Sequence, residues 1–158
     1  MISAVSRFLT AGCVMPQISR SALVPFSVEQ MYNLVNDVRA YPEFLPGCVG
    51  SRIISHDQDE MTASVDVSKA GISKTFVTRN QLTSNQHIRM QLVEGPFRKL
   101  MGGWSFIPLS PEACKVELNL DFEFTNKLVE LAFGRIFKEL AGNMVMAFTK
   151  RAKEVYRV

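Results

Sequence analysis

The residue types that most often carry catalysis are scarce in this sequence, and they match no catalytic spacing. The two histidines, His56 and His87, fall at expected strand ends or turns, where nothing in the pattern pairs with them. Histidines in such places are usually solvent-exposed surface residues. Cys48 and Cys114 are interpreted as small core-filling side chains, because isolated cysteines are commonly buried. These four residues give little support for nucleophilic or acid–base catalysis.

The acidic and glycine-rich segments do not change this conclusion. Glu117, Asp121 and Glu123 share the polar, water-facing side of one expected strand. Carboxylates in bulk water keep ordinary pKa values and make poor general acids or bases. Gly102 and Gly103 lack the lysine and hydroxyl residue of a phosphate-binding loop. We therefore predict no enzymatic activity and no obligatory cofactor.

Apolar residues at strand and helix spacing predict a ligand cavity. A curved sheet closed by one helix leaves a space between two apolar faces, and such pockets suit apolar ligands. A segment stiffened by Pro42 and Pro46 is expected to cover it as a lid. The alternative is that these side chains simply fill the core. The candidate lining residues are Tyr41, Phe44, Leu45, Val65, Val67, Phe76, Trp104, Phe106, Leu118, Leu120, Phe122, Phe133, Phe137, Leu140 and Met144.

Basic residues near the C-terminus form the second candidate site. We expect them to share one side of a helix, opposite its apolar stripe, where they would contact RNA phosphates. The alternative is an ordinary solvated face whose cations favour the C-terminal end of the helix dipole. Glu139 and Glu154 on the same helix favour that alternative. The candidate basic residues are Arg135, Lys150, Arg151, Lys153 and Arg157.

Composition limits the class of protein. The chain has 158 residues, of which 47% are hydrophobic and 21% charged, as is ordinary for a globular protein. This length favours one domain with a substantial core. A net charge of +3 is too small for attachment to nucleic acid by bulk charge alone. The three cysteines include no C-x-x-C pair, which argues against a disulfide framework and a zinc site and fits a reducing cytoplasm.

The first fourteen residues differ from the rest of the chain. Arg7 interrupts a short, weakly apolar stretch, which is unlike a signal peptide. A lipoprotein cleavage site is disfavoured because Thr10 stands where a large aliphatic residue is usual. We expect residues 1–14 to be a disordered or mis-assigned extension, with Met15 as the true start. The predicted domain then covers residues 15–158.

Alternation and turn residues predict a mostly antiparallel sheet. Residues 17–24 form an expected first strand, and Ser27 with Gln30 makes a capping-box pattern before a short helix. Two prolines and a glycine in residues 38–47 allow only helical turns and a loop. Gly102 and Gly103 suggest a bulge or bend in their strand. Six further strands are expected at residues 49–56, 61–69, 72–84, 87–93, 100–109 and 114–124.

A long amphipathic helix is expected to end the chain. Residues 126–156 place Phe133, Phe137 and Phe148 on one broad stripe, with Thr125 or Asn126 as the cap. The sheet must bury its dry face against this helix, because its other face is polar. The predicted class is α+β: a seven-stranded curved antiparallel sheet around a long C-terminal helix, with two short helices after the first strand.

This order of elements resembles the helix-grip fold of START domains, birch-pollen allergens and polyketide cyclase-like proteins. From Met15 to Tyr156, the chain is similar to the coenzyme-Q-binding START-like family, and within it to a bacterial group of ribosome-association toxins. Motifs shared with the family are Val35-Asn36-Asp37-Val38, Tyr41-Pro42-x-Phe44-Leu45-Pro46, Gly95-Pro96-Phe97, Trp104-x-Phe106, Asp121-Phe122-x-Phe124 and Arg151-Ala152-x-Glu154-Val155-Tyr156. Those shared with the toxin group are Pro16-Gln17-Ile18-Ser19-Arg20, Val67-Ser68-Lys69-Ala70-Gly71-Ile72-Ser73-Lys74-Thr75-Phe76 and Phe133-Gly134-Arg135.

The resemblance implies two functions. The toxin group binds the large (50S) ribosomal subunit, blocks its joining with the small subunit, and is encoded beside a small antitoxin protein. The wider family binds ubiquinone or a related isoprenoid lipid in its cavity and supports respiration. The resemblance thus implies a cytoplasmic toxin with a lipid cavity, no DNA partner and at most peripheral membrane contact. Its alternatives are a ubiquinone carrier or chaperone and, more remotely, a cyclase-type enzyme.

Overall fold

The most regular alternation in the sequence builds an interior strand of the sheet, next to one edge. In the computed structural model, which describes residues 17–156, this strand is β7 (Ala113–Phe124). Val116, Leu118 and Phe122 are fully buried on one side, while Asn119 on the other is exposed. β7 lies between β1 (Gln17–Val24) and β6 (Phe97–Ser110) and pairs antiparallel with both. The predicted dry and wet faces are therefore both present.

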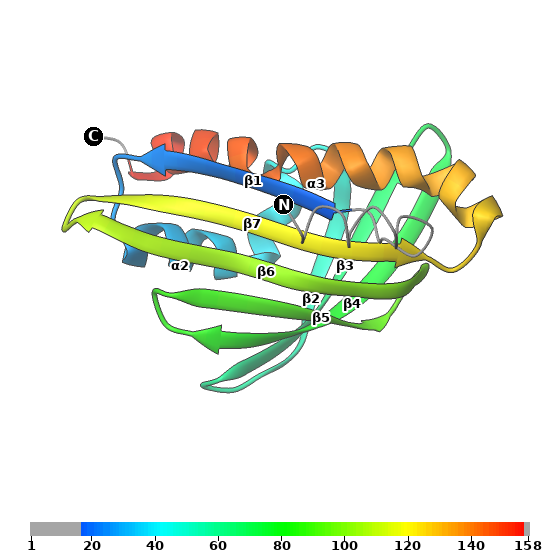
Figure 1. The fold of residues 1–158 in the computed structure, drawn as a ribbon, viewed down its shortest axis with the longest axis horizontal. Coiled ribbons are helices and arrows are strands. Elements are labelled where there is room, and N and C mark those ends of the chain that lie inside the picture. The colour runs from blue at the N-terminus through cyan, green and yellow to red at the C-terminus, as the bar shows by residue number, and fades with distance from the viewer. Residues whose placement is uncertain (1–16, 157–158) are drawn as a thin grey trace, which may run out of the picture.

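The described strands form one seven-stranded antiparallel sheet. Its order is β1-β7-β6-β5-β4-β3-β2, so β1 and β2 are the edges (Figure 1). Every strand except β1 pairs with its neighbour in the chain, so the sheet is a meander that β1 joins from the far end. The remaining strands are β2 (Cys48–His56), β3 (Glu60–Lys69), β4 (Ile72–Thr83) and β5 (His87–Glu94).

Two short helices follow β1, as predicted. α2 (Val28–Asn36) begins with the expected capping box, in which the Gln30 amide donates to Ser27 Oγ and the Ser27 amide donates to Gln30 Oε1. η2 (Val38–Glu43) is a 3₁₀ helix that contains Pro42. Its tighter winding fits the sequence, since proline prevents a longer α-helix here.

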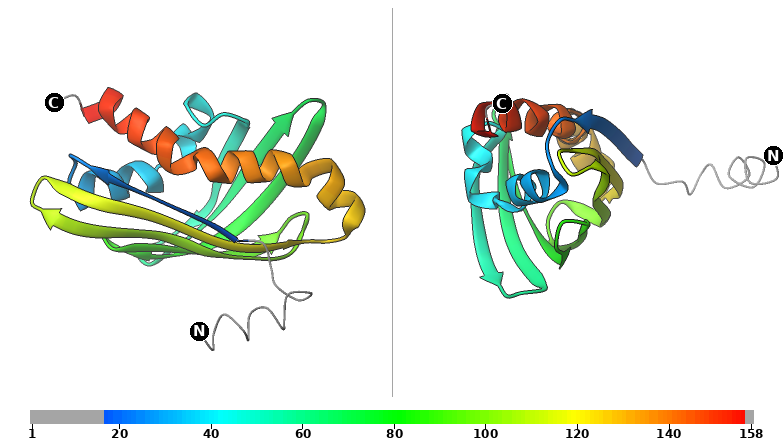
Figure 2. Two further views of the ribbon diagram at one scale, coloured as in Figure 1. Left: turned by 45° about the horizontal axis from the view of Figure 1, so that its top comes forward. Right: turned by 90° about the vertical axis from the view of Figure 1, so that its left-hand side faces the viewer.

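The long helix α3 (Lys127–Tyr156) closes the open side of the curved sheet (Figure 2). Asn126 caps it, because its Oδ1 accepts a 2.9 Å hydrogen bond from the Val129 amide. The Tyr156 hydroxyl donates to the Gln30 carbonyl at 2.8 Å, which joins the end of α3 to α2. Within residues 17–156, no helix is both long and apolar enough to span a membrane.

These elements make the α+β helix-grip fold that the sequence predicts. The clearest boundary difference is β6, which begins at Phe97 rather than at residue 100, because Gly95 and Pro96 make only a short connection and Phe97 already pairs with Phe124. Residues 1–14, the predicted extension, lie outside the described part of the chain.

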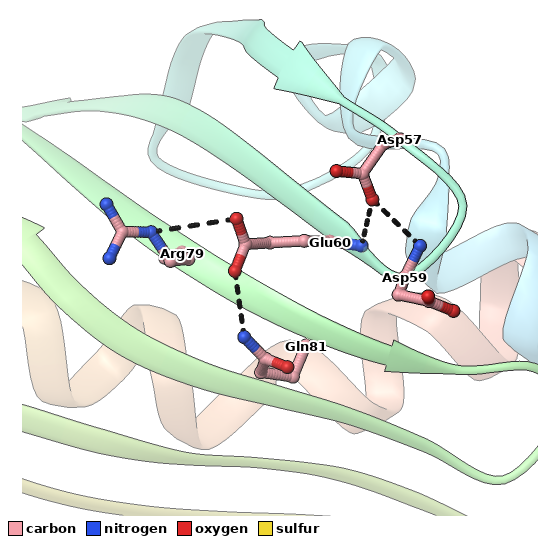
Figure 3. A network of polar contacts seen from close by, with 5 residues as sticks. All are labelled: Asp57, Asp59, Glu60, Arg79 and Gln81. Carbon is pink, nitrogen blue, oxygen red and sulfur yellow. Dashed lines mark hydrogen bonds and ion pairs between the residues drawn. The ribbon is translucent and has the colours of Figure 1, made fainter.

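A polar network on the outer face ties β3 to β4 and helps to set which side chains face inward (Figure 3). Glu60 on β3 accepts a 2.8 Å hydrogen bond from Gln81 and lies 3.9 Å from the Arg79 guanidinium, both on β4. Asp57 accepts from the amides of Asp59 and Glu60 and so shapes the turn that leads into β3. Because strand side chains alternate, residues 78 and 80 must point to the opposite face, into the interior.

Gly102 and Gly103 mark a close approach of backbones rather than a bulge. The β6–β7 register is continuous at both residues, and its shifts lie elsewhere. A Cβ on Gly102, whose φ is +141°, would collide with the Asn119 carbonyl on β7, and one on Gly103 would collide with the Ile88 carbonyl on β5. Only glycine fits between these strands without displacing one of them.

We predict that Gly102→Ala lowers the free energy of unfolding by about 3 kcal/mol, as expected for backbone strain combined with a steric clash. Gly71→Ala is the matched control, because Gly71 also has a positive φ of +81° but has open space around it. Its cost should be about 1 kcal/mol, from strain alone. Urea denaturation of both variants measures the difference, and equal losses would contradict the clash.

Candidate ligand cavity and its lid

The space between α3, η2 and the concave face of the sheet contains an apolar cavity of about 70 Å³. Among the predicted lining residues, those that surround it are Tyr41, Leu45, Val65, Phe76, Leu120, Phe137, Leu140 and Met144. They come from η2 and the turn after it, from three strands and from α3. The structure thus brings these residues together around one space.

The other predicted lining residues pack in the core beside this cavity. Trp104 contacts Phe148, with 5.2 Å between ring centroids, and Phe122 contacts Phe137 at 4.9 Å. Such aromatic pairs pack in the hydrophobic core, so the alternative interpretation as core applies to them. This group comprises Phe44, Val67, Trp104, Phe106, Leu118, Phe122 and Phe133.

Sequence reasoning missed the polar part of the lining. Thr78 and Asn80 on β4 face the cavity and are buried, with 8% and 6% of their surface exposed. The Thr78 hydroxyl donates a 2.9 Å hydrogen bond to Asn80 Oδ1. The signal was present, because both residues interrupt an alternating apolar series that runs from Phe76 to Leu82. The other lining residues that were missed are Val38, Cys48, Ala63, Met90, Leu100 and Ala141.

The lid, which consists of η2 and the turn after it, is held in place by hydrogen bonds to α2 and β2. The Tyr41 hydroxyl donates to the Val35 carbonyl at the end of α2, and Ser51 Oγ donates to the Val38 carbonyl at 2.7 Å. Burial raises the pKa of the Tyr41 hydroxyl well above its ordinary value, so it remains a neutral donor. η2 is therefore anchored to both α2 and β2.

Arg151 holds the lid from the side of α3, which corrects its predicted place on the outer surface. Its guanidinium lies 2.8 Å from Glu43 Oε1 and 5.0 Å from the centre of the Phe44 ring, and its side chain is 23% exposed. The reason is helical geometry: at 100° per residue, Arg151 lies about 160° around the helix from Arg135. Arg151 thus belongs to the side of α3 that faces η2.

The other basic candidates in the described chain lie on the outer side of α3. Arg135 is 91% exposed and lies 3.9 Å from Glu139, a weak surface pair. Lys150 and Lys153 are exposed, and neither takes part in an ion pair among the described residues. Arg157 lies outside the described residues.

The cysteines and glutamates that were considered as catalytic groups are not placed for catalysis. Burial raises the pKa of the Cys114 thiol to about 11 and also raises that of Cys48, so neither is a ready thiolate near neutral pH. Glu117 and Glu123 form ion pairs on the outer face with Lys115 and Arg98. In residues 17–156, no three His, Cys, Asp or Glu side chains are grouped closely enough to hold a metal ion.

Comparison with known proteins assigns the chain to a family. Residues 24–149 match the family described as polyketide cyclase / dehydrase and lipid transport. The chain belongs to this family. The ribosome association toxin RatA of Escherichia coli K12 is 74% identical over 149 residues, which cover 94% of each chain.

Other proteins that the chain resembles carry other names. The mitochondrial coenzyme Q-binding protein COQ10 homolog B of Xenopus laevis is 31% identical over 144 residues, which cover 89% of this chain and 59% of that protein. The crystal structure of the Zhui aromatase/cyclase from Streptomyces sp. R1128 superposes with a TM-score of 0.76 at 18% identity, covering 91% of this chain and 97% of that one. This last likeness shows the fold alone.

We predict that Arg151→Met loosens the lid. Methionine keeps much of the side-chain packing but removes the ion pair and the cation–π contact, together worth about 1 kcal/mol. Amide hydrogen exchange across η2 should become about fivefold faster, as expected for that free-energy change. Arg135→Met, which removes an exposed pair far around the helix, should leave this exchange unchanged. Equal exchange in the two variants would refute the anchoring role.

We also predict that the folded protein protects its buried thiols. With the pKa raised from 9.0 to about 11, the thiolate fraction of Cys114 at pH 8 falls, by about a hundredfold. Its alkylation by iodoacetamide, mapped by mass spectrometry, should be at least that much slower in native buffer than in urea. The native rate should keep rising until about pH 11. A plateau near pH 9.0, its ordinary value, would contradict the shift.

Proposed function

We propose that this protein is a RatA-like toxin that binds the large (50S) ribosomal subunit and blocks its association with the small subunit. The observation that carries the proposal is the 74% identity, over 94% of both chains, with the relative named ribosome association toxin RatA. Similarity at this level, with the coverage nearly complete, favours a shared activity over a shared fold alone. A ribosomal partner also places the protein in the cytoplasm.

The outer side of α3 is the proposed ribosome contact. Arg135, Lys150 and Lys153 supply positive charge for RNA phosphates. Leu128 and Leu131 on the same helix are 77% and 79% exposed, unusual for large apolar side chains on a surface without a partner. This combination fits a partner made of RNA and protein. A small antitoxin protein, as implied by the toxin resemblance, would be a second partner.

Ribosome binding is tested by sedimentation. Excess protein added to ribosomes should increase the free subunit peaks at the expense of the joined ribosome. Lys150→Glu with Lys153→Glu should weaken this effect and flatten the dependence of log affinity on log salt by about two, one for each lost phosphate contact. The control is Arg39→Glu with Arg52→Glu, an equal charge change at exposed residues of η2 and β2.

The outcomes test the proposed function and the proposed α3 surface independently. Wild-type protein that leaves the subunit profile unchanged would refute the proposed function. Equal loss in both double variants would refute only the α3 surface, because it would attribute the effect to net charge.

The second proposed activity is the binding of ubiquinone or a related isoprenoid lipid. The apolar cavity and the relative named coenzyme Q-binding protein support it. A volume of about 70 Å³ is below the roughly 300 Å³ of ordinary small-molecule pockets, so a ligand must displace the lid or repack side chains. Arg151 and Tyr41 then become the contacts that resist entry.

Cyclase-type catalysis is less favoured by the lining. Among the described residues around the cavity, the titratable groups are Tyr41 and Cys48, and burial raises the pKa of both. A proton-transfer reaction near neutral pH needs a group whose pKa lies near the working pH. We therefore propose a binding protein rather than an enzyme.

Lipid binding predicts selective protection of one cysteine. Cys48 lines the cavity, whereas Cys114 is buried on β7 away from it. A short-chain ubiquinone at saturation should slow the alkylation of Cys48 by about tenfold or more, in proportion to the fraction bound. Cys114 serves as the internal control and should keep its rate. Unchanged alkylation of Cys48 at the solubility limit of the quinone would argue against binding.

A further inference from the structure

The cavity contains one polar feature in an otherwise apolar wall. Thr78 and Asn80 are among the few buried polar residues of the described chain, and both face the cavity from β4. Their position on the cavity wall raises the question of what this polar pair could bind there.

The hydrogen bond between the two residues leaves one group available. Thr78 Oγ1 donates to Asn80 Oδ1 at 2.9 Å, which orients the amide and uses one of the two lone pairs of its acceptor oxygen. None of the side-chain hydrogen bonds among residues 17–156 uses Asn80 Nδ2. The amide nitrogen carries two donor hydrogens, and it belongs to a residue that is only 6% exposed. The free group is therefore a donor that needs an acceptor.

The surrounding strands hold this donor in position. Asn80 pairs with Met61 on β3 and with Met90 on β5, so its backbone lies in the middle of the sheet. Its neighbours in the chain, Arg79 and Gln81, are both bound to Glu60 on the outer face. Rotation of the strand to expose Asn80 would break this network (Figure 3). The donor is thus presented to the cavity by a rigid element.

The wall also limits the charge of the ligand. No lysine, arginine or histidine is among the residues that line the cavity in the described chain. A buried carboxylate would have no opposite charge there, and an uncompensated buried charge is strongly unfavourable. A neutral oxygen acceptor, such as a ketone or quinone carbonyl, meets no such penalty and matches an amide donor.

We infer that Asn80, oriented by Thr78, donates a hydrogen bond to a carbonyl oxygen at the head of a neutral apolar ligand. The ligand then enters with its carbonyl end toward β4, and its hydrocarbon part lies against Phe137, Leu140 and Met144. This assignment rests on the proposed lipid-binding activity and adds to it the chemical class and orientation of the ligand. It disfavours fatty acids, whose carboxylate would be buried unpaired.

The test measures quinone binding by fluorescence. Trp104 is the single tryptophan of the chain, so its quenching by ubiquinone with two isoprene units reports binding in this protein. Asn80→Leu removes the donor at similar volume and should weaken binding by about tenfold, the effect of one hydrogen bond. Thr78→Val removes only the orienting bond and should weaken binding by about threefold. Gln91→Leu makes the same amide-to-leucine change at an exposed residue of β5 that does not line the cavity, and should stay within twofold of wild type.

A competitor without oxygen supplies the second readout. An isoprenoid hydrocarbon of matched length, added against the quinone, should bind wild type and Asn80→Leu equally. Geranic acid, which is charged, should compete poorly with both. Circular dichroism and thermal unfolding confirm that the variants are folded; if Asn80→Leu does not fold, Thr78→Val decides.

Each outcome has one meaning. Weaker quinone binding in the two β4 variants, with Gln91→Leu unchanged, supports the assignment. Quenching that is equal in all four proteins overturns the role of Asn80 and leaves the lipid-binding proposal standing. Absence of quenching in wild type overturns both.

Discussion

The burial of one face of a curved antiparallel sheet against a single helix is the constraint on which the structure depends. Every strand has a dry side, and α3 must cover it along a length of thirty residues. Phenylalanines from β6, β7 and α3 do so where they meet, with Phe97 and Phe137 4.7 Å apart between ring centroids. Beside them lies the cavity, whose lining includes two small side chains, Ala63 and Ala141. The cavity thus lies within the contact between α3 and the sheet that it covers.

The same helix connects the interior to the surface. Its inner side carries Leu140 and Met144 on the cavity and Arg151 on the lid, while Lys150 and Lys153 point outward. Any ligand that displaces the lid must act on the contacts of Arg151, next in the chain to Lys150. The proposed ribosome surface and the proposed lipid cavity are therefore two sides of one rigid element, and neither requires the other to be absent.

Most of the fold could be predicted from local patterns, because periodicity reports which face of an element is buried. Alternation along β7 and the phenylalanine stripe on α3 determine the sheet and its cover. The cavity was harder, because the pattern that puts Leu118 and Leu120 on the same face cannot say which of them meets empty space. Asn80 was missed for a related reason. The sequence shows a polar residue in an alternating apolar series, but only the structure shows that its amide donor is unused. Arg151 was misplaced because it was assigned to the same side of the helix as Arg135, whereas its angle on the helix turns it toward Glu43.

The different names carried by the relatives need not describe competing functions. A toxin that binds ribosomes and a protein that binds coenzyme Q can share this fold if one activity uses the outer side of α3 and the other uses its inner side. The hydrogen bond from Thr78 to Asn80 contributes nothing to an exposed surface, and exposed Leu131 contributes nothing to a cavity. Because the two groups of residues do not overlap, substitutions in one should leave the other activity intact. Separate effects of the two groups of substitutions distinguish a fold with two functional sites from a fold whose cavity is only a packing defect.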